Sequence, residues 1–326
     1  MGYTSTEISF PGLGIPEFTV DRIAFTVFGR PVAWYGIIIA MGMLVAIGYI
    51  MWRTTQYKGI KPDDVIDFAL FVIIFGVIGA RLYYVLTSDH SYDSFLEVIA
   101  VWEGGLAIYG GIIAGAITAL VVCRVKKIRY QCFFDMLAPA VMIAQAIGRW
   151  GNFCNGEAYG SFTDSFIGME LTHIYPSGVE RYVGIVHPTF LYESLWNVAG
   201  FVLLNIFYKK RKFDGQICLG YIAWYGFGRF FIEGLRQDSL WVGPFRISQV
   251  VGLLSFVAAM TAMIYFWFFR KAERYANVSL TDDNTEQQSD NGFEITQAAE
   301  QTENERDNGT EKEEINSLSK EKKDNG

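Results

Sequence analysis

Residues 31–270 of this 326-residue chain consist mainly of long apolar stretches that alternate with short polar segments. A helix needs about 20 apolar residues, each rising about 1.5 Å, to cross the hydrocarbon layer of a membrane, which is about 30 Å thick. Several stretches reach or approach this length. The pattern predicts an all-α polytopic membrane protein with seven transmembrane helices, which begin near Val32, Val65, Gly105, Cys132, Pro188, Gln216 and Ile247.

Positive charge marks alternate ends of these stretches. Lys and Arg cluster after the first, third, fifth and seventh stretch, around Arg53, at 124–129, at 209–212 and around Arg270. Connections rich in Lys and Arg stay in the cytoplasm. We therefore expect the N-terminal segment 1–30 outside the cytoplasm, a small folded extracytoplasmic appendage at 151–187, and the C-terminus inside.

Composition adds a tail to this picture. The chain is 51% hydrophobic and 16% aromatic, above the average for soluble proteins. Its net charge of −7 arises from residues 275–326, which carry 14 Asp and Glu against 5 Lys and Arg. We expect 271–326 to be a disordered, acidic cytoplasmic tail behind a seven-span catalytic domain at 31–270. The acidic balance of the whole chain therefore says nothing about a site.

Polar side chains inside the predicted spans gather at one depth. A charge at the centre of a span costs about 2.5 kcal/mol or more, so each charge needs a partner or a function. In the sixth span Arg229, Glu233 and Arg236 have the spacing that places them on one helical face. The cytoplasmic halves contribute comparatively few such residues. At the outer level the other spans contribute Tyr35, Arg81, Glu103, Tyr109, Arg149, Asn152, Asn155, Glu157, His187 and Glu193.

Several of these residues also have a purely structural interpretation. Arg229 and Glu233 could neutralise each other and join helices, and Tyr35 could be an aromatic residue of the membrane interface. His187 could cap the fifth span, and the glycines of WEGGLAIYGGIIAGA could allow close helix packing. Packing gives no reason for polar residues to collect in one leaflet. The shared depth therefore favours a functional site.

Arg81, Arg149 and Arg229 suit a phosphate ester, because guanidinium groups bind phosphate oxygens in pairs and stay charged. At this level of a membrane the phosphate belongs to a phospholipid headgroup, and Asn152 can donate to or accept from a headgroup hydroxyl. The scattered cysteines and the missing nucleotide-binding motifs predict neither a metal nor a cofactor. The carboxylates that could balance the arginines or move a proton are Glu157, Glu193 and Glu233.

The stretch GRWGNFCNGEAYG, at 148–160, resembles the signature of the bacterial prolipoprotein diacylglyceryl transferases. Further motifs of that family follow its order and lie on the expected spans. As a set they are highly specific and cover the chain from about residue 30 to 270. They are WYG at 34–36, GARLYYVL at 79–86, WEGGLAIYGG at 102–111, HPTFLYES at 187–194 and GRFFIEGLRQD at 228–238.

The resemblance implies an enzyme that moves the diacylglyceryl group of phosphatidylglycerol onto the lipobox cysteine of a preprolipoprotein and releases glycerol phosphate. It implies a site toward the outer leaflet of the bacterial cytoplasmic membrane, and we expect no nucleic-acid partner. The residues assigned to catalysis are Arg149, Arg229, Glu157, Glu233 and Tyr109. Those assigned to phosphatidylglycerol are Tyr35, Arg149, Asn152, Gly160 and Arg81, with Glu193, His187 and Arg236 in support.

Tyr109 departs from the family pattern, because many members carry a histidine before the double glycine of this motif. A substrate thiol has a pKa near about 8.5 and must lose its proton, whereas a tyrosine with a pKa near about 10 is a poor base. We therefore place proton removal on Glu157 or Glu233, or on the arginines that lower the thiol pKa. Tyr109 is left as a hydroxyl donor to the phosphate or the ester.

Two other classes of protein could also place polar residues inside a membrane. A phospholipid or anion transporter should continue its polar residues into the inner leaflet, where they become sparse here. An intramembrane protease should show a serine and histidine pair or twin aspartates within its spans, and the sequence shows neither. The pattern favours the transferase.

Overall fold

A computed structural model describes residues 3–55, 60–88, 92, 94–101, 104–237 and 241–268. The chain divides into two units, Met1–Ala276 and Asn277–Gly326, and all of the described residues belong to the first. The predicted tail at 271–326 lies outside the described residues, as do Trp102 and Glu103.

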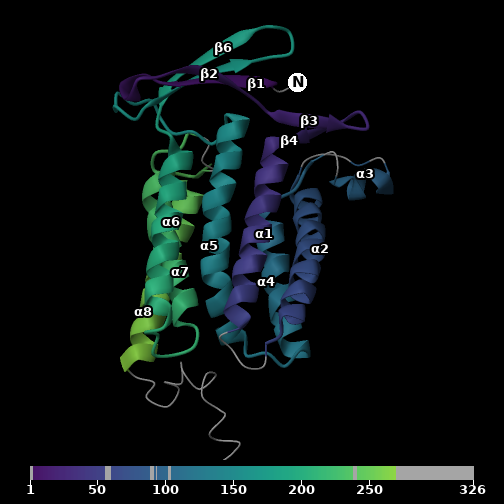
Figure 1. Ribbon diagram of the computed structural model, residues 1–326, viewed down its shortest axis with the longest axis vertical. Helices are drawn as coiled ribbons and strands as arrows, with labels where there is room; N and C mark the ends of the chain where they lie inside the picture. The colour runs from purple at the N-terminus through teal and green to yellow at the C-terminus, as the bar shows by residue number, and fades with distance from the viewer. Residues whose placement is uncertain are drawn as a thin grey trace, which may run out of the picture. The chain divides into compact units, whose positions relative to one another are not determined.

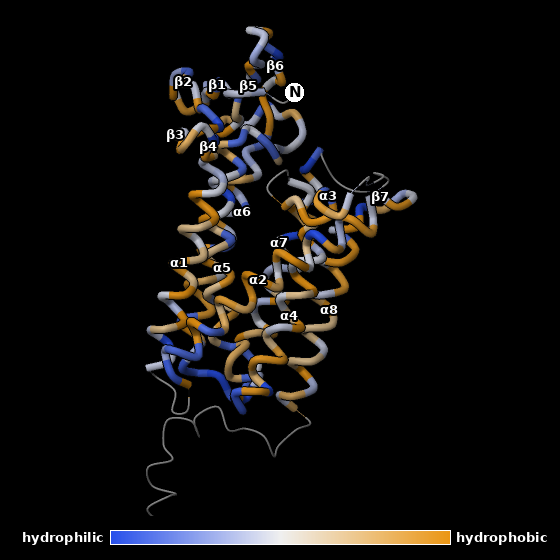
Figure 2. Tube along the Cα trace, turned by 90° about the vertical axis from the view of Figure 1, so that its right-hand side faces the viewer, coloured by the Kyte–Doolittle hydropathy of each residue, from blue (hydrophilic) through white to orange (hydrophobic). Residues whose placement is uncertain are grey.

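Long apolar helices dominate the described residues (Figure 1). Six helices are long and apolar enough to cross a membrane, and hydrophobic residues run along most of the bundle in Figure 2. The prediction of a multi-pass membrane protein is therefore confirmed. The six helices are Trp34–Thr54 (α1), Pro62–Thr87 (α2), Ile108–Val125 (α4), Tyr130–Asn155 (α5), Thr189–Tyr208 (α6) and Ile247–Phe268 (α8).

The predicted sixth span forms the helix α7, Gln216–Glu233, which is not among those six. It has 18 residues, and Arg229 and Glu233 near its end lower the apolar character of this whole length. The reduced apolar character of α7 comes from residues that were predicted to form the site. The count of seven spans and the sidedness of the termini stay predictions.

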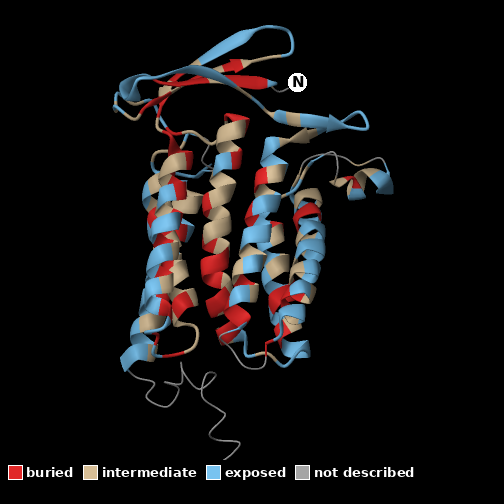
Figure 3. Cartoon of the chain, viewed as in Figure 1, coloured by how far each residue is buried: buried red, intermediate tan, exposed pale blue. Residues whose placement is uncertain are grey.

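Helix α5 is the centre of the bundle (Figure 1). Half of its most apolar stretch is buried, against 11% for α8. Figure 3 shows the same contrast between the buried middle and the exposed outer surfaces of the helices. Phe133, Met136 and Met142 of α5 are at most 1% exposed and pack with Leu204 of α6 and Ile217 of α7. This core sets the relative positions of α5, α6 and α7.

Helices α2 and α4 cross closely through small residues. A β-carbon on Gly79 would lie 2.2 Å from Cβ of Ala114, and one on Gly110 would lie 2.3 Å from the Gly79 carbonyl oxygen. Two glycines of the sequence motifs therefore serve helix packing, as their structural interpretation predicts.

The end of the bundle at the start of α6 carries a four-stranded antiparallel sheet (Figure 1). Its order is β2-β1-β5-β6, so the N-terminal segment and the segment 151–187 share one sheet. The prediction of an all-α protein was wrong here, because alternating apolar residues in both segments form strands rather than helices. The strands are Ser5–Phe10 (β1), Ile15–Asp21 (β2), Met169–Ile174 (β5) and Glu180–Val186 (β6).

The buried face of this sheet packs on the ends of α5 and α6. Ile8, Leu171 and Val186 are fully buried and form one cluster with Phe190 of α6, against which Phe153 of α5 packs. This packing holds the sheet directly over the end of α5, where the predicted signature lies.

Two hairpins, a short helix and a 3-10 turn complete the described fold. A hairpin of Ile23–Val27 (β3) and Arg30–Ala33 (β4) leads directly into α1, and a hairpin of Trp241–Val242 (β7) and Phe245–Arg246 (β8) leads into α8. A short helix, Phe95–Ile99 (α3), lies between α2 and α4 in the chain, and the 3-10 turn Pro11–Leu13 (η1) joins β1 to β2.

Candidate active site

Helix α5 ends in a tight turn that carries Glu157. Gly156 follows the last helical residue with a φ of 63°, in the left-handed region that favours glycine. A β-carbon on Gly156 would lie 2.3 Å from Oγ1 of Thr6 in β1, so a larger residue would collide with the sheet. The turn brings Glu157 back to the helix end, where its backbone N–H donates to the Asn152 carbonyl at 3.1 Å.

Two amide side chains hold the Glu157 carboxylate. Nδ2 of Asn152 and Nδ2 of Asn155 both donate to Oε1 of Glu157, at 3.2 and 3.0 Å. The Glu157 side chain stays partly exposed. The carboxylate is therefore fixed on one side and accessible on the other.

The sheet fixes the same turn from above. The Tyr3 hydroxyl and Nε2 of His173 donate to the Gly156 carbonyl at 3.1 and 3.0 Å, and the Tyr3 and His173 rings stack with centroids 3.9 Å apart. Burial lowers the pKa of His173, which favours the neutral ring that carries a single proton. Neither residue could be predicted from the sequence, because their contact depends on pairing between distant strands.

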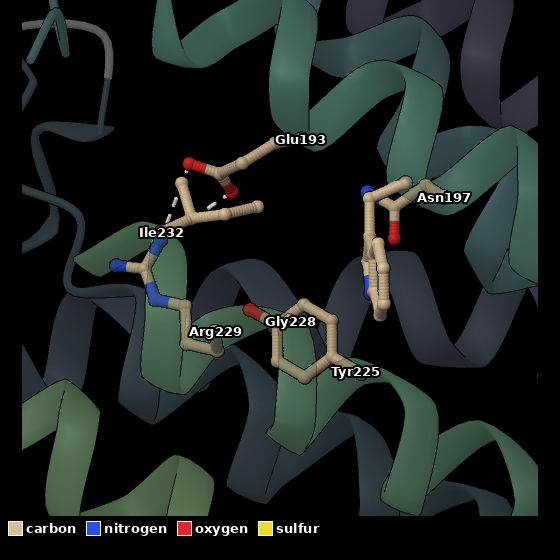
Figure 4. Close-up of a pocket in the computed structure, with 7 residues that line it drawn as sticks. Glu193, Asn197, Tyr225, Gly228, Arg229 and Ile232 are labelled. Atoms are coloured by element: carbon tan, nitrogen blue, oxygen red, sulfur yellow. Dashed lines mark hydrogen bonds and ion pairs between the residues drawn. The ribbon is translucent and has the colours of Figure 1, made fainter. Parts of the chain in front are cut away.

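Glu193, in the first turns of α6, is bound by three arginines. It is 5% exposed. Its Oε2 lies 2.7 Å from Nη2 of Arg149 on α5 and 3.4 Å from Nη1 of Arg229 on α7, and its Oε1 lies 3.5 Å from Nη1 of Arg236. Residues from three segments of the chain therefore meet at one carboxylate. Figure 4 shows Glu193 and Arg229 facing each other across the gap between α6 and α7.

Arg229 also binds Glu233, one turn further along α7. Nη2 of Arg229 lies 2.5 Å from Oε2 of Glu233, which is 2% exposed. Arg246 of β8, just before α8, donates to the Glu233 carbonyl. The pair was expected either to neutralise itself or to serve a site. The structure shows that Arg229 does both, since it also reaches Glu193.

Asn152 connects the two halves of the site. Nη1 of Arg149 donates to Oδ1 of Asn152 at 3.5 Å, and Asn152 donates to Glu157. A chain of polar contacts therefore crosses three helices in the order Glu157, Asn152, Arg149, Glu193, Arg229 and Glu233. Every member of this chain was predicted from the sequence to belong to the site.

The charge of this arrangement favours an anion. We call Arg149, Arg229, Arg236, Glu193 and Glu233 the Glu193 cluster. Its three arginines and two glutamates leave one positive charge inside the bundle, and guanidinium groups bind phosphate or carboxylate oxygens in pairs. Among the described residues, no group of three or more His, Cys, Asp or Glu side chains could hold a metal ion.

Two further predicted residues lie beside this chain of contacts. Gly160 pairs with Arg236 in an isolated antiparallel bridge, and a β-carbon on it would lie 2.7 Å from Cβ of His187. Tyr35 packs against α5, where a β-carbon on Gly151 would lie 2.8 Å from its ring. Gly160 therefore allows the segment 151–187 to approach Arg236. Tyr35 lies next to the turn of α5 that carries Asn152.

Arg81 occupies a different place. Its guanidinium donates to the carbonyls of Val98 at 2.8 Å, Gly104 at 2.8 Å and Gly105 at 3.1 Å, and also to that of Glu97. The side chain is 8% exposed, and no contact within the described part of the chain joins it to the Glu193 cluster. Arg81 therefore orders the segment between α2 and α4, and its predicted phosphate contact stays a prediction.

Tyr109 and His187 also stand apart from the chain of contacts. Tyr109 is 38% exposed in the first turn of α4, with no hydrogen bond to the Glu193 cluster among the described residues. Nδ1 of His187 lies 3.1 Å from the Tyr192 hydroxyl, and the His187 carbonyl accepts from the backbone of Gly160 and Thr189. His187 thus supports the segment that leads into α6, close to its structural interpretation.

Two further residues beside the cluster were not predicted from the sequence. Asn197 and Tyr225 line a small pocket together with Glu193 and Arg229 (Figure 4). Asn197 lies four residues after Glu193 and Tyr225 four residues before Arg229, which is the spacing of one helical face. That spacing was a usable signal, because an asparagine within an apolar helix needs a partner.

The fold and the site define a multi-pass membrane protein with a buried, arginine-rich site for an anionic group. The model of the family "Prolipoprotein diacylglyceryl transferase" matches residues 22–265. The phosphatidylglycerol–prolipoprotein diacylglyceryl transferase of Enterococcus faecalis is 46% identical over 252 residues, which cover 75% of this chain and 90% of that protein. The protein of the same name from Clostridioides difficile is 42% identical over 247 residues, covering 76% and 95%. That from Listeria monocytogenes is 41% identical over 249 residues, covering 76% and 90%.

The chain belongs to the prolipoprotein diacylglyceryl transferase family, and it is a transferase. The resemblance drawn from the sequence motifs is confirmed, and so is the predicted class of enzyme. The matched residues include the described parts of α1, α2, α4, α5, α6 and α7, so they cover the whole of the site.

Proposed function

We propose that this enzyme transfers the diacylglyceryl group of phosphatidylglycerol to the lipobox cysteine of preprolipoproteins, at the outer leaflet of the bacterial cytoplasmic membrane. The observation that carries the proposal is the meeting of Arg149, Arg229 and Arg236 around Glu193, one hydrogen bond away from Asn152. The positive-inside pattern of Lys and Arg supports the sidedness, because it places the sheet end of the bundle outside.

The reaction forms a carbon–sulfur bond and breaks a carbon–oxygen bond. The cysteine sulfur attacks the diacylglyceryl carbon that bears the phosphate, and the bonding electrons leave with the phosphate oxygen of glycerol phosphate. The phosphodiester carries one negative charge and the leaving phosphate carries a second, while the thiol releases one proton. The site must therefore stabilise one additional negative charge in the transition state.

Arg149 and Arg229 supply that stabilisation in our proposal. Their guanidinium groups come from different helices and share the buried Glu193 carboxylate, so the cluster keeps one positive charge without a ligand. A leaving phosphate that gains charge attracts these groups more strongly than the starting phosphodiester does. Glu193 holds the two arginines in place, and Arg236 in turn binds Glu193.

Glu157 is the better candidate for the base that removes the thiol proton. Its carboxylate is partly exposed and held by two amide groups, whereas Glu233 is buried 2.5 Å from Arg229. Proton removal by Glu157 places the thiolate beside Asn152 and Arg149. Tyr35 and Gly160 border the same space and support the headgroup, while Tyr109 donates a hydrogen bond to the phosphate or the ester.

The test compares Arg149→Lys and Glu157→Gln with the wild type in an assay of labelled diacylglyceryl transfer to a lipobox peptide. We expect each variant to lose about 10²-fold or more in kcat/KM, because each removes a group that acts in the transition state. Arg181→Lys, an exposed change in β6, is the matched control and should keep full activity. Wild-type rates in both site variants would exclude this assignment, and lipid movement without transfer would favour a transporter.

A further inference from the structure

A small pocket lies between α6 and α7, and Glu193 and Arg229 of the Glu193 cluster line it (Figure 4). Its volume is about 10 Å³, which is about the space of one water oxygen. A group of this size cannot be an acyl chain or a phosphate. The residues that line it are Glu193, Trp196 and Asn197 of α6 and Tyr225, Gly228, Arg229 and Ile232 of α7.

Asn197 brings an unused hydrogen-bond acceptor to this pocket. The residue is 2% exposed, and its Oδ1 is buried without a hydrogen-bond partner among the described residues. Two turns further along α6, Asn205 differs in this respect, because its Oδ1 accepts from the Tyr49 hydroxyl at 2.8 Å. A buried acceptor without a donor costs free energy, so its retention points to a ligand that donates.

The walls of the pocket are fixed. Trp196 of α6 and Trp224 of α7 stack with centroids 4.2 Å apart, and each indole N–H donates to the backbone carbonyl of the other residue, at 3.1 and 3.0 Å. A β-carbon on Gly228 would lie 2.1 Å from Nε1 of Trp196. The two helices are therefore already in contact and cannot approach each other further to close the space between Asn197 and Tyr225. The pocket keeps its size.

We propose that the pocket binds one hydroxyl group, which donates to the buried Oδ1 of Asn197. The hydroxyl belongs either to a water molecule or to the glycerol headgroup of the lipid, and this inference rests on the proposed function. A water molecule can give its second hydrogen to the Glu193 carboxylate, which completes the usual number of partners for a buried water. If the group is water, Asn197 is a positioning residue that keeps Glu193 in place beside the arginines. If it is the headgroup hydroxyl, Asn197 contacts the substrate directly.

The test uses two substitutions of equal shape in the full-length enzyme. Asn197→Leu removes the acceptor, and Asn197→Asp retains it. We expect Asn197→Leu to lower kcat/KM with phosphatidylglycerol about tenfold, the effect of losing one hydrogen bond in a buried site. Asn197→Asp should keep more activity than Asn197→Leu. Phosphatidylethanol, whose headgroup has no free hydroxyl, serves as a second lipid substrate. Comparing it with phosphatidylglycerol shows whether water or the headgroup supplies the bound hydroxyl.

The ratio of kcat/KM for the two lipids separates the sources. If the headgroup supplies the hydroxyl, Asn197→Leu lowers transfer from phosphatidylglycerol and leaves transfer from phosphatidylethanol unchanged. If water supplies it, both fall by the same factor. Ser194 lies on α6, like Asn197, and its hydroxyl donates to the Ala146 carbonyl of α5. Ser194→Ala removes this buried hydrogen bond, so it should lower the melting temperature without changing the ratio.

An asparagine with only a structural role predicts a different result. Asn197→Leu would then raise the melting temperature, because an unpaired acceptor disappears, and would transfer at the wild-type rate. That result overturns the inference while wild-type activity still supports the proposed function. A high-resolution structure gives an answer that does not depend on activity: oxygen density within hydrogen-bond distance of Oδ1 supports the hydroxyl site, and an empty pocket excludes it.

Discussion

Helices α5 and α7 carry buried charges at both ends, and the two ends differ in how the charges are compensated. At the sheet end, the Glu193 cluster sets three arginines against two glutamates. At the opposite end, the buried Asp135 of α5 and Asp214 before α7 face the buried Arg211 and the exposed Arg129, in equal numbers. We call this second group the Asp135 cluster.

The charged groups of the Asp135 cluster find their ion-pair and hydrogen-bond partners within the protein. The Asp135 carboxylate is fully buried and accepts from the backbone N–H groups of Gly215 and Cys218 at 2.8 and 2.9 Å. It therefore satisfies free donors at the start of α7 and joins that helix to α5. The Glu193 and Glu233 carboxylates accept from no backbone N–H in the described residues, and the cluster as defined holds one more arginine than glutamate. Equal numbers of opposite charges indicate a structural role, and an excess of one sign indicates a charged ligand.

The largest effect should come from removing a charge from the balanced cluster. Asp135→Asn places an amide where two backbone N–H groups and Arg211 require a carboxylate. Breaking a buried ion pair on one side costs about 3–5 kcal/mol, so we expect a marked fall in thermal stability. Transfer by the folded fraction should keep its kcat and KM. A normal melting temperature with slow transfer would instead make Asp135 part of the site.

The matched substitution in the Glu193 cluster should have the opposite profile. Glu193→Gln leaves three arginines in place with one more unit of positive charge, so lipid binding should not weaken. The arginines lose their common partner, and we expect kcat to fall about 10²-fold while KM stays the same or falls. Steady-state kinetics with labelled lipid measure both constants. A rise in KM at constant kcat would mean that Glu193 contacts the lipid itself.

This contrast also shows what the sequence could predict. The long apolar stretches locate the helices, and the spacing of Arg229 and Glu233 places them on one face of α7. The family motifs then identify every member of the contact chain from Glu157 to Glu233. The contact between Asp135 and Arg211 could not be predicted, because nothing in the sequence indicates that the connection at 209–215 folds back onto α5.

Other features depend on contacts between distant residues. Arg81 and Arg149 look alike in sequence, since both lie near the outer end of a predicted span. Four carbonyls between α2 and α4 surround Arg81, whereas Glu193 binds Arg149, and only the folded chain shows this difference. The pairing of β1 with β5 joins segments about 160 residues apart, which periodicity along the chain cannot indicate.

A smaller effect should connect the sheet to the unbalanced end of the bundle. Burial lowers the pKa of His173 below its usual value of about 6.5, so the folded protein favours the neutral ring. Above that value the stabilisation is fully present. As the pH falls below about 6.5, the unfolded chain binds a proton more readily than the folded protein, and stability is lost until the folded pKa is passed.

The protonation of His173 should also affect the turn that carries Glu157, because His173 and Tyr3 both donate to the Gly156 carbonyl. The positive charges of Arg22 and Arg181 also disfavour a protonated His173. We expect the melting temperature to fall modestly between pH 7.5 and pH 5.5, which differential scanning fluorimetry can measure. His173→Gln keeps an N–H donor but does not titrate, so it should reduce this pH dependence and change transfer at pH 7.5 little. An unchanged pH profile would show that His173 does not link the sheet to the Glu157 turn.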